Sequence, residues 1–185
     1  MVNFTYRLSP ENKFPCHLED TTLVFDWVKK NADKFGMDTE HVFAVGDSAG
    51  GHILALYCSL CTNLEFAANF DFKPVENLLP KAIALNCAVL DIDTIDGGMS
   101  SSSMKLMNDV LPKNKKKEYL PLVNPIAHVN EKFPPCFIMT CNEDFLKEQP
   151  ETFKKKLEDC GVPYKYEFYG DEENRTFLLI LSFHL

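Results

Sequence analysis

Apolar and polar residues divide the chain into two kinds of segment. Short runs that are almost continuously apolar are typical of buried strands, whereas longer runs with apolar residues at helical spacing are typical of helices. The expected strands are residues 2–7, 41–45, 81–90, 135–141 and 162–169, and the expected helices are residues 18–35, 48–62 and 148–160. Gly36 and Gly161 directly follow two of these helices, where glycine commonly ends a helix.

Strands alternate with helices throughout this pattern, and most of the strands lack the polar alternation of a half-exposed sheet. These two features indicate an α/β fold with a mostly parallel sheet that has helices on both faces. On this interpretation the 185 residues form a single domain. Ligands of such sheets bind beyond the carboxyl ends of the strands, so candidate chemistry is expected in the loops that follow the strands.

Composition narrows the classes of partner. The chain is 45% hydrophobic and has a formal net charge of −8, which argues against nucleic acid or an anionic membrane as a partner. Its longest apolar run, residues 177–183, is too short to span a bilayer. Most of the seven cysteines lie in apolar runs, and no set of them has zinc-site spacing. We therefore expect free thiols, a cytoplasmic location, and neither a metal nor an organic cofactor.

The motif GDSAGG, residues 46–51, joins an expected strand to the helix that follows it. A very tight turn of this kind holds its central residue in a strained conformation, with the side chain pointing out of the sheet. Small residues at Gly46 and Gly50 would keep the helix from colliding with the strand. Ser48 is therefore a candidate nucleophile, and the backbone N–H of Ala49 is a candidate donor to an oxyanion. Two other interpretations of the motif are open. It could be a phosphate-binding turn, although it lacks the usual glycine spacing, or a purely structural turn.

A serine nucleophile needs a base and an acid that orients the base, and in this kind of fold the chain order is serine, acid, histidine. Asp144 lies just past the expected strand at residues 135–141, where the acid should be. Glu143 is its neighbour, but Asp144 begins an Asp-x-Leu turn towards the next helix. The alternative role of Asp144 is to cap the amino end of that helix.

Three segments resemble the hormone-sensitive-lipase-like branch of the α/β-hydrolases, and within it small microbial acetyl, aryl and feruloyl esterases. The first, YRLSPENKFPCHLEDTTLVFDWV, is similar to the family's Tyr-Arg-Leu-Ala-Pro-Glu segment, and the second, GMDTEHVFAVGDSAGG, to the segment with its Gly-Asp-Ser-Ala-Gly-Gly motif. The third, FPPCFIMTCNEDFLKEQPETFKKKLEDCGVPYKYEFY, is similar to its acid-bearing strand, the next helix and the next strand. Together they cover most of residues 4–169.

The resemblance implies an α/β-hydrolase that cleaves short-chain carboxylic esters of small molecules through an acyl-enzyme. It makes Ser48 the nucleophile, Asp144 the triad acid and the Ala49 N–H one oxyanion donor. Asp47 would support the tight turn that carries the serine, which we call the elbow, or shape the acyl pocket. The residues of the elbow around the serine are Gly46, Asp47, Gly50 and Gly51.

The resemblance also implies a small cap over the site, formed by residues 91–119. Four apolar side chains of this segment either line a pocket for the acyl or alcohol group or only pack the cap. They are Met99, Met104, Leu106 and Met107. Packing is the favoured interpretation.

The chain departs from the family's pattern at two places. The family has a His-Gly-Gly type loop and early strands before the first matching segment, and neither precedes that segment here, so the sequence looks truncated. No histidine stands near residues 175–178, where the family places the triad base. His184 is the only histidine after Asp144 and is therefore the candidate base in the right chain order. The alternative function is an inactive fragment or pseudoenzyme that keeps the pocket but lacks the oxyanion loop and the catalytic histidine.

The other histidines fit the role of base less well. His52 lies one turn into the elbow helix and is the next candidate, although packing is the favoured interpretation. His17 starts a helix, and His41 lies at the amino end of the elbow strand, on the wrong side of the sheet. His128 lies in a loop, where we expect it to be exposed.

Overall fold

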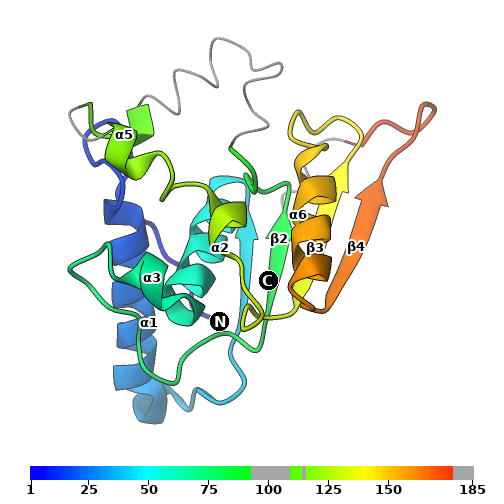
Figure 1. The fold of residues 1–185 in the computed structure, drawn as a ribbon. Coiled ribbons are helices and arrows are strands. Elements are labelled where there is room, and N and C mark those ends of the chain that lie inside the picture. Colours follow the sequence, from blue (N-terminus) through cyan, green and yellow to red (C-terminus); the bar gives the residue numbers. More distant parts are fainter. Residues whose placement is uncertain (93–108, 114–115, 177–185) are drawn as a thin grey trace.

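Four parallel strands form one sheet in a computed structural model of the chain, in the order β1-β2-β3-β4 (Figure 1). The structure describes residues 1–92, 109–113 and 116–176. The strands are β1 (Phe43–Asp47), β2 (Ala82–Asn86), β3 (Cys136–Cys141) and β4 (Tyr164–Tyr169). The parallel α/β architecture is therefore confirmed, and the carboxyl ends of all four strands lie at one edge of the sheet.

Three long helices occur where apolar residues recur at helical spacing. They are α1 (Cys16–Phe35), α2 (Ala49–Thr62) and α6 (Gln149–Asp159). Gly36 ends α1 in the left-handed conformation, with φ of 61°, as its position after the expected helix indicated. The shorter helices are α3 (Leu64–Ala67), α5 (Lys116–Tyr119) and the 3-10 helix η2 (Pro125–His128). Among the helices that the structure describes, none is long and apolar enough to cross a membrane.

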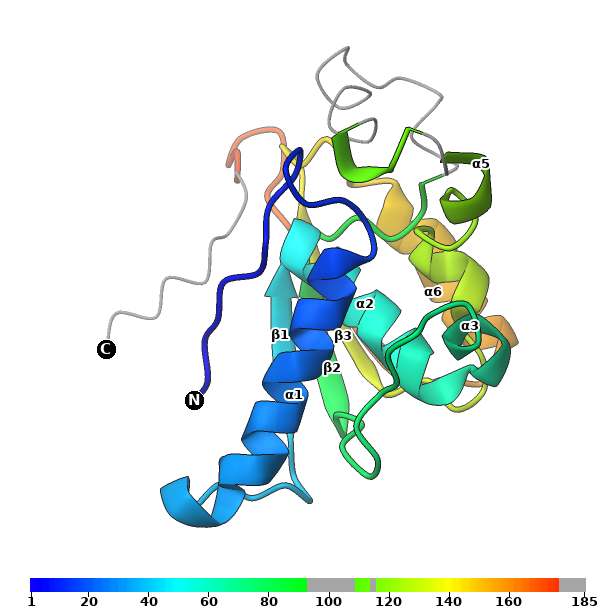
Figure 2. The same cartoon turned by 90° about the vertical axis from the view of Figure 1, so that its left-hand side faces the viewer.

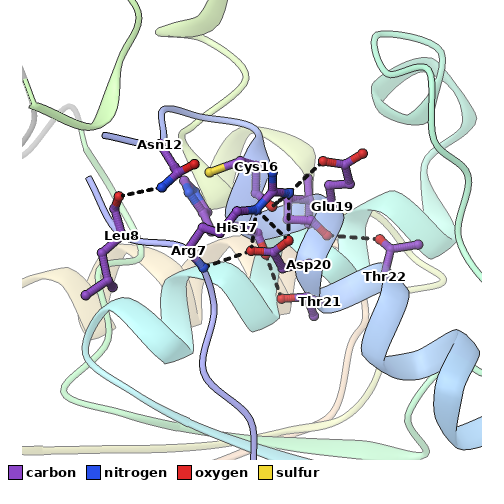
Figure 3. Close-up of polar contacts among 10 residues, drawn as sticks. Arg7, Leu8, Asn12, Cys16, His17, Glu19, Asp20, Thr21 and Thr22 are labelled. Carbon is purple, nitrogen blue, oxygen red and sulfur yellow. Dashed lines mark hydrogen bonds and ion pairs between the residues drawn. The ribbon is translucent and has the colours of Figure 1, made fainter. Parts of the chain in front are cut away.

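The amino-terminal segment corrects one expectation, because residues 2–7 form no strand. The Arg7 backbone N–H donates to the Asp20 carboxylate at 2.8 Å instead of pairing with a neighbouring strand. The Arg7 guanidinium also donates to Asp20 and to Glu19, both in the first turns of α1 (Figure 3). Burial alone would raise the pKa of Asp20, but the hydrogen bonds from Arg7 outweigh it and hold the pKa below its usual value. Side chains of α1 thus fix this segment beside the sheet (Figure 2).

The main core lies between the sheet and the two helices α2 and α6, which cover the same face (Figure 2). Leu54 of α2, Leu85 of β2 and Ile138 of β3 are buried there together with Phe153 and Leu157 of α6. The two parallel crossovers that contain α2 and α6 place these helices on one face because both have the usual right-handed sense.

A second cluster packs α1 against α2. The Phe25 ring of α1 stacks on the Tyr57 ring of α2, with 4.1 Å between ring centroids. Phe14, just before α1, packs edge-on against Tyr119 of α5 at 5.5 Å. The cluster therefore ties the first helix both to the elbow helix and to the carboxyl end of the expected cap.

The opposite face of the sheet is more open within the described residues. We expected helices on both faces, yet Phe43 is 67% exposed and Val45 58% exposed on the face of β1 that points away from α2. Both residues are apolar and alternate with half-buried or buried neighbours, as a strand covered on one face requires.

Candidate active site

Ser48 lies between the end of β1 and the first residue of α2, which is the strand-turn-helix context that the sequence predicted. Its φ of 50° and ψ of −116° are rare for a residue other than glycine and cost about 1–3 kcal/mol. Two hydrogen bonds hold this conformation. The Ser48 N–H donates to the Asn86 carbonyl at 2.9 Å, and the Ser48 carbonyl accepts from the His52 N–H at 3.1 Å.

The structure agrees with the role expected for Gly46 but not with the one expected for Gly50. A Cβ atom at Gly46 would lie 2.5 Å from backbone atoms of Gly50 and Gly51, so the close approach of strand and helix needs glycine there. A Cβ atom at Gly51 would lie 2.5 Å from the Ala88 Cβ. At Gly50 it would meet nothing within 4 Å. The prediction that a small residue is needed at Gly50 is therefore wrong in this structure, and Gly51 carries that requirement instead.

Ala49 supports the expected role in oxyanion binding by its place in the fold. It is the first residue of α2 and is exposed. The N–H groups of the first turn of a helix have no acceptor within the helix, and they carry its partial positive charge. The Ala49 N–H is thus available to an anion formed beside Ser48.

Asp47 precedes the serine and is half-buried. Its Oδ1 accepts a short hydrogen bond from the Asn86 amide, and Asn86 lies directly opposite it on β2. Burial raises the pKa of Asp47, the Asn86 hydrogen bond opposes that effect, and the nearby charge of Asp144 raises it further. This contact with β2 agrees with a supporting role for Asp47 at the elbow, one of the two roles that the resemblance allowed.

Asp144 lies in the turn after β3, and 4% of its surface is exposed. Its Oδ2 accepts from the Thr140 hydroxyl at 2.7 Å, and its Oδ1 accepts from the Leu146 N–H at 3.0 Å. The alternative role as a helix cap is not seen, because α6 begins five residues later, at Gln149. Asp144 is thus a buried, oriented carboxylate rather than a helix cap.

The sheet sets the separation between Ser48 and Asp144. Ser48 follows β1 and Asp144 follows β3, and β2 lies between these strands. With a spacing of about 4.8 Å between neighbouring strands, the two loops start about 10 Å apart. An imidazole ring placed between them could contact a serine hydroxyl on one side and a carboxylate on the other, which is the arrangement of a catalytic triad.

The structure does not assign that imidazole. His184 lies outside the described residues, so its role stays a prediction. The His52 Nε2 lies 2.7 Å from the Val123 carbonyl and must donate to it, so this nitrogen cannot accept a proton from Ser48. Burial lowers the pKa of His52, and burial also lowers the pKa of His17, to about 3.

The remaining histidines are also engaged elsewhere. His41 lies at the amino end of β1, as its place in the sequence suggested, and its Nδ1 lies 2.7 Å from the Asp38 carboxylate. His128 was expected to be exposed, but it is half-buried because its ring stacks on Phe66 at 4.0 Å.

Only the two ends of the expected cap, residues 91–119, can be compared with the structure. Residues 93–108, and with them Met99, Met104, Leu106 and Met107, lie outside the described part. Near the second end, the Lys13 ammonium donates to the Asp109 carbonyl at 2.5 Å and the Phe14 N–H donates to the Val110 carbonyl at 2.8 Å. The loop before α1 thus anchors the end of the segment, and the cap itself stays a prediction.

Two residues of the site were missed in the sequence. Asn86 contacts both Asp47 and Ser48, and Thr140 contacts Asp144. Both are polar residues at the end of an otherwise apolar strand, and that pattern could have drawn attention to them. Among the described residues, no group of three or more histidine, cysteine, aspartate or glutamate side chains is arranged to hold a metal ion.

Comparison with known proteins agrees with this fold. Residues 1–176 match a family described as having the alpha/beta hydrolase fold. A versiconal hemiacetal acetate esterase from Dothistroma septosporum is 29% identical over 184 residues, which cover 91% of this chain and 54% of that protein. An arylesterase from Saccharolobus solfataricus is 28% identical over 171 residues, which cover 88% of this chain and 53% of that protein.

Solved structures show the same fold. Esterase B from Lactobacillus rhamnosis superposes with a TM-score of 0.78 at 21% identity, covering 89% of this chain and 53% of that one. This chain therefore spans about half the length of the relatives it matches. From the match over residues 1–176 and the strand-turn-helix at Ser48, we conclude that the chain belongs to the alpha/beta hydrolase fold family.

Proposed function

We propose that the protein is a carboxylic-ester hydrolase that works through an acyl-enzyme on Ser48. The observation that carries this proposal is the strained backbone of Ser48, at the tip of β1 and directly before the first N–H groups of α2. Strain at a residue other than glycine is usually kept where function requires it. The esterase and the arylesterase among the relatives support the same class of reaction.

In the proposed mechanism, the Ser48 hydroxyl oxygen attacks the ester carbonyl carbon while a base takes its proton. The carbonyl oxygen becomes an oxyanion, which the Ala49 N–H stabilises. The intermediate collapses as the base gives its proton to the leaving oxygen, the neutral alcohol departs, and an acyl group remains on Ser48. Water then attacks the acyl-enzyme by the same route and releases the acid. Asp144 orients the base, for which His184 is the candidate.

Hydrolysis of p-nitrophenyl acetate and butyrate by the purified chain tests this proposal. Replacing Ser48→Ala should reduce the rate by roughly 10⁴-fold or more. A control is Ser59→Ala, a serine eleven residues further along α2 and hence about 16 Å away along the helix axis. The variant His184→Ala, assayed together with Ser48→Ala, tests whether His184 acts as the base. A folded chain with no more activity than Ser48→Ala would contradict the proposal and favour the inactive alternative.

We also propose a small-molecule ester as the substrate and a cytoplasmic location for the protein. All seven cysteines are free thiols, and four of them are buried, which suits a reducing compartment. Mass spectrometry after alkylation of the protein from its native cells would detect disulfides if this location were wrong.

A further inference from the structure

Asn86, the last residue of β2, contacts both residues at the centre of the elbow. Its backbone carbonyl accepts the Ser48 N–H at 2.9 Å, and its side-chain amide donates to Asp47 Oδ1. Asn86 is 2% exposed, whereas Asp47 and Ser48 are half-buried, so both contacts start from a buried residue. One residue of the neighbouring strand thus holds the peptide on which the serine is presented.

The next residue extends this connection to the acid. Cys87 has a φ of 43°, which ends β2, and its N–H donates to the Met139 carbonyl of β3 at 2.8 Å. Thr140 follows on β3, and its hydroxyl holds Asp144. The pair Asn86 and Cys87 therefore links the serine loop on β1 to the acid loop on β3.

The chemistry of an amide suits this position. Two carboxylates, Asp47 and Asp144, lie close enough for the charge of one to raise the pKa of the other. A carboxylate at residue 86 would add a third negative charge, whereas an asparagine amide donates a hydrogen bond to Asp47 without adding charge.

We infer that Asn86 is a positioning residue for the nucleophile. Its backbone carbonyl accepts the Ser48 N–H, and its side-chain amide holds Asp47 from the neighbouring strand, so that the strained Ser48 peptide stays in place. This inference rests on the proposed role of Ser48 in ester hydrolysis. It does not require that the reaction itself be observed, because the position of the peptide can be followed separately.

Amide hydrogen exchange at Ser48 in the full chain tests the inference. Asn86→Leu keeps the approximate volume and the backbone carbonyl but removes the amide donor. We expect exchange of the Ser48 N–H to become at least about tenfold faster, because local opening of the turn becomes easier. The pKa of Asp47, followed by carbon-13 NMR, should rise further. Asn69→Leu, in an exposed turn after α3, is the control and should change neither quantity.

A second variant covers the case in which Asn86→Leu does not fold. Asp47→Asn keeps the shape but removes the charge from the acceptor, so it should also speed exchange at Ser48, by a smaller factor. Unchanged exchange at Ser48 in a folded Asn86→Leu chain would overturn the inference, and so would unchanged exchange in Asp47→Asn where that variant alone folds.

Kinetics separate this result from the proposed function. Hydrolysis of p-nitrophenyl butyrate by Asn86→Leu should show a kcat lowered about tenfold with little change in KM, because a misplaced nucleophile slows chemistry more than binding. A rise in KM alone, with kcat unchanged, would contradict a positioning role. If the parent chain hydrolyses no ester, the proposed function fails, while the exchange data still decide how Asn86 holds the turn.

Discussion

At the scale of a single residue, the hydroxyl of Thr140 contributes to the stability of the fold. It is fully buried and donates to Asp144 Oδ2, which is itself buried. Replacing Thr140→Val would leave a carboxylate oxygen without this donor, at a cost of about 1–3 kcal/mol in the free energy of unfolding. Thr140→Ser keeps the hydroxyl and should lose less. Urea denaturation of both variants measures the difference, and equal stabilities would contradict the assigned contact.

A single buried residue, His17, makes the stability of the fold depend on pH. Burial lowers its pKa from 6.5 to about 3, and its ring lies 6.5 Å from that of His52. The unfolded chain binds the proton more readily, so the stability from a neutral His17 is present above pH 6.5 and is lost as the pH falls towards 3. Between pH 7 and pH 5 the free energy of unfolding should drop by about 2 kcal/mol through this residue.

The variant His17→Phe isolates that contribution. It keeps an aromatic ring beside Tyr6 and Phe14 but cannot take up a proton. Its free energy of unfolding, measured by urea denaturation at both pH values, should depend less on pH than that of the parent by the same amount. An identical pH dependence in the two chains would show that His17 does not stay neutral in the folded state.

At the scale of elements, the elbow makes opposite predictions for two adjacent glycines of α2. Gly51→Ala brings a Cβ atom to 2.5 Å from Ala88 on the loop after β2, and we expect a loss of about 1–3 kcal/mol. Gly50→Ala meets open space, and because alanine favours helix we expect a gain of up to about 1 kcal/mol. Thermal unfolding of the two variants compares them directly. A similar loss for both would contradict the packing described for the elbow.

Local signals explain which elements could be predicted. The tight turn around Ser48, the helix end at Gly36 and the acid after β3 depend on neighbouring residues, and all three lie where the sequence placed them. The strand expected at residues 2–7 is absent because the Arg7 N–H finds Asp20, a partner thirteen residues away. Asn86 escaped notice for a similar reason, since its contacts depend on the register of β1 and β2.

At the scale of the whole molecule, the two faces of the sheet differ. The helices α2 and α6 cover one face, whereas Phe43 and Val45 are exposed on the other. Apolar side chains side by side on an exposed strand favour association with other apolar surfaces. We expect the 185-residue chain to bind a hydrophobic dye and to associate as its concentration rises.

The double variant Phe43→Ser and Val45→Thr tests this expectation. Both changes reduce apolar surface on β1, and threonine keeps a high preference for strands. Dye fluorescence and the mass measured by light scattering should both fall relative to the parent chain. A parent chain that is monomeric and binds no dye would show that this face is covered in solution.

Covalent labelling of Ser48 tests the central claim most directly. A fluorophosphonate reacts with an activated serine, displaces fluoride and leaves a stable phosphonyl ester, which peptide mapping by mass spectrometry can locate. We predict one adduct, on the peptide that contains Ser48, which is lost in Ser48→Ala and forms more slowly in Asp144→Asn. No adduct on a folded parent chain, or an adduct that persists in Ser48→Ala, would contradict the claim that this turn presents a catalytic nucleophile.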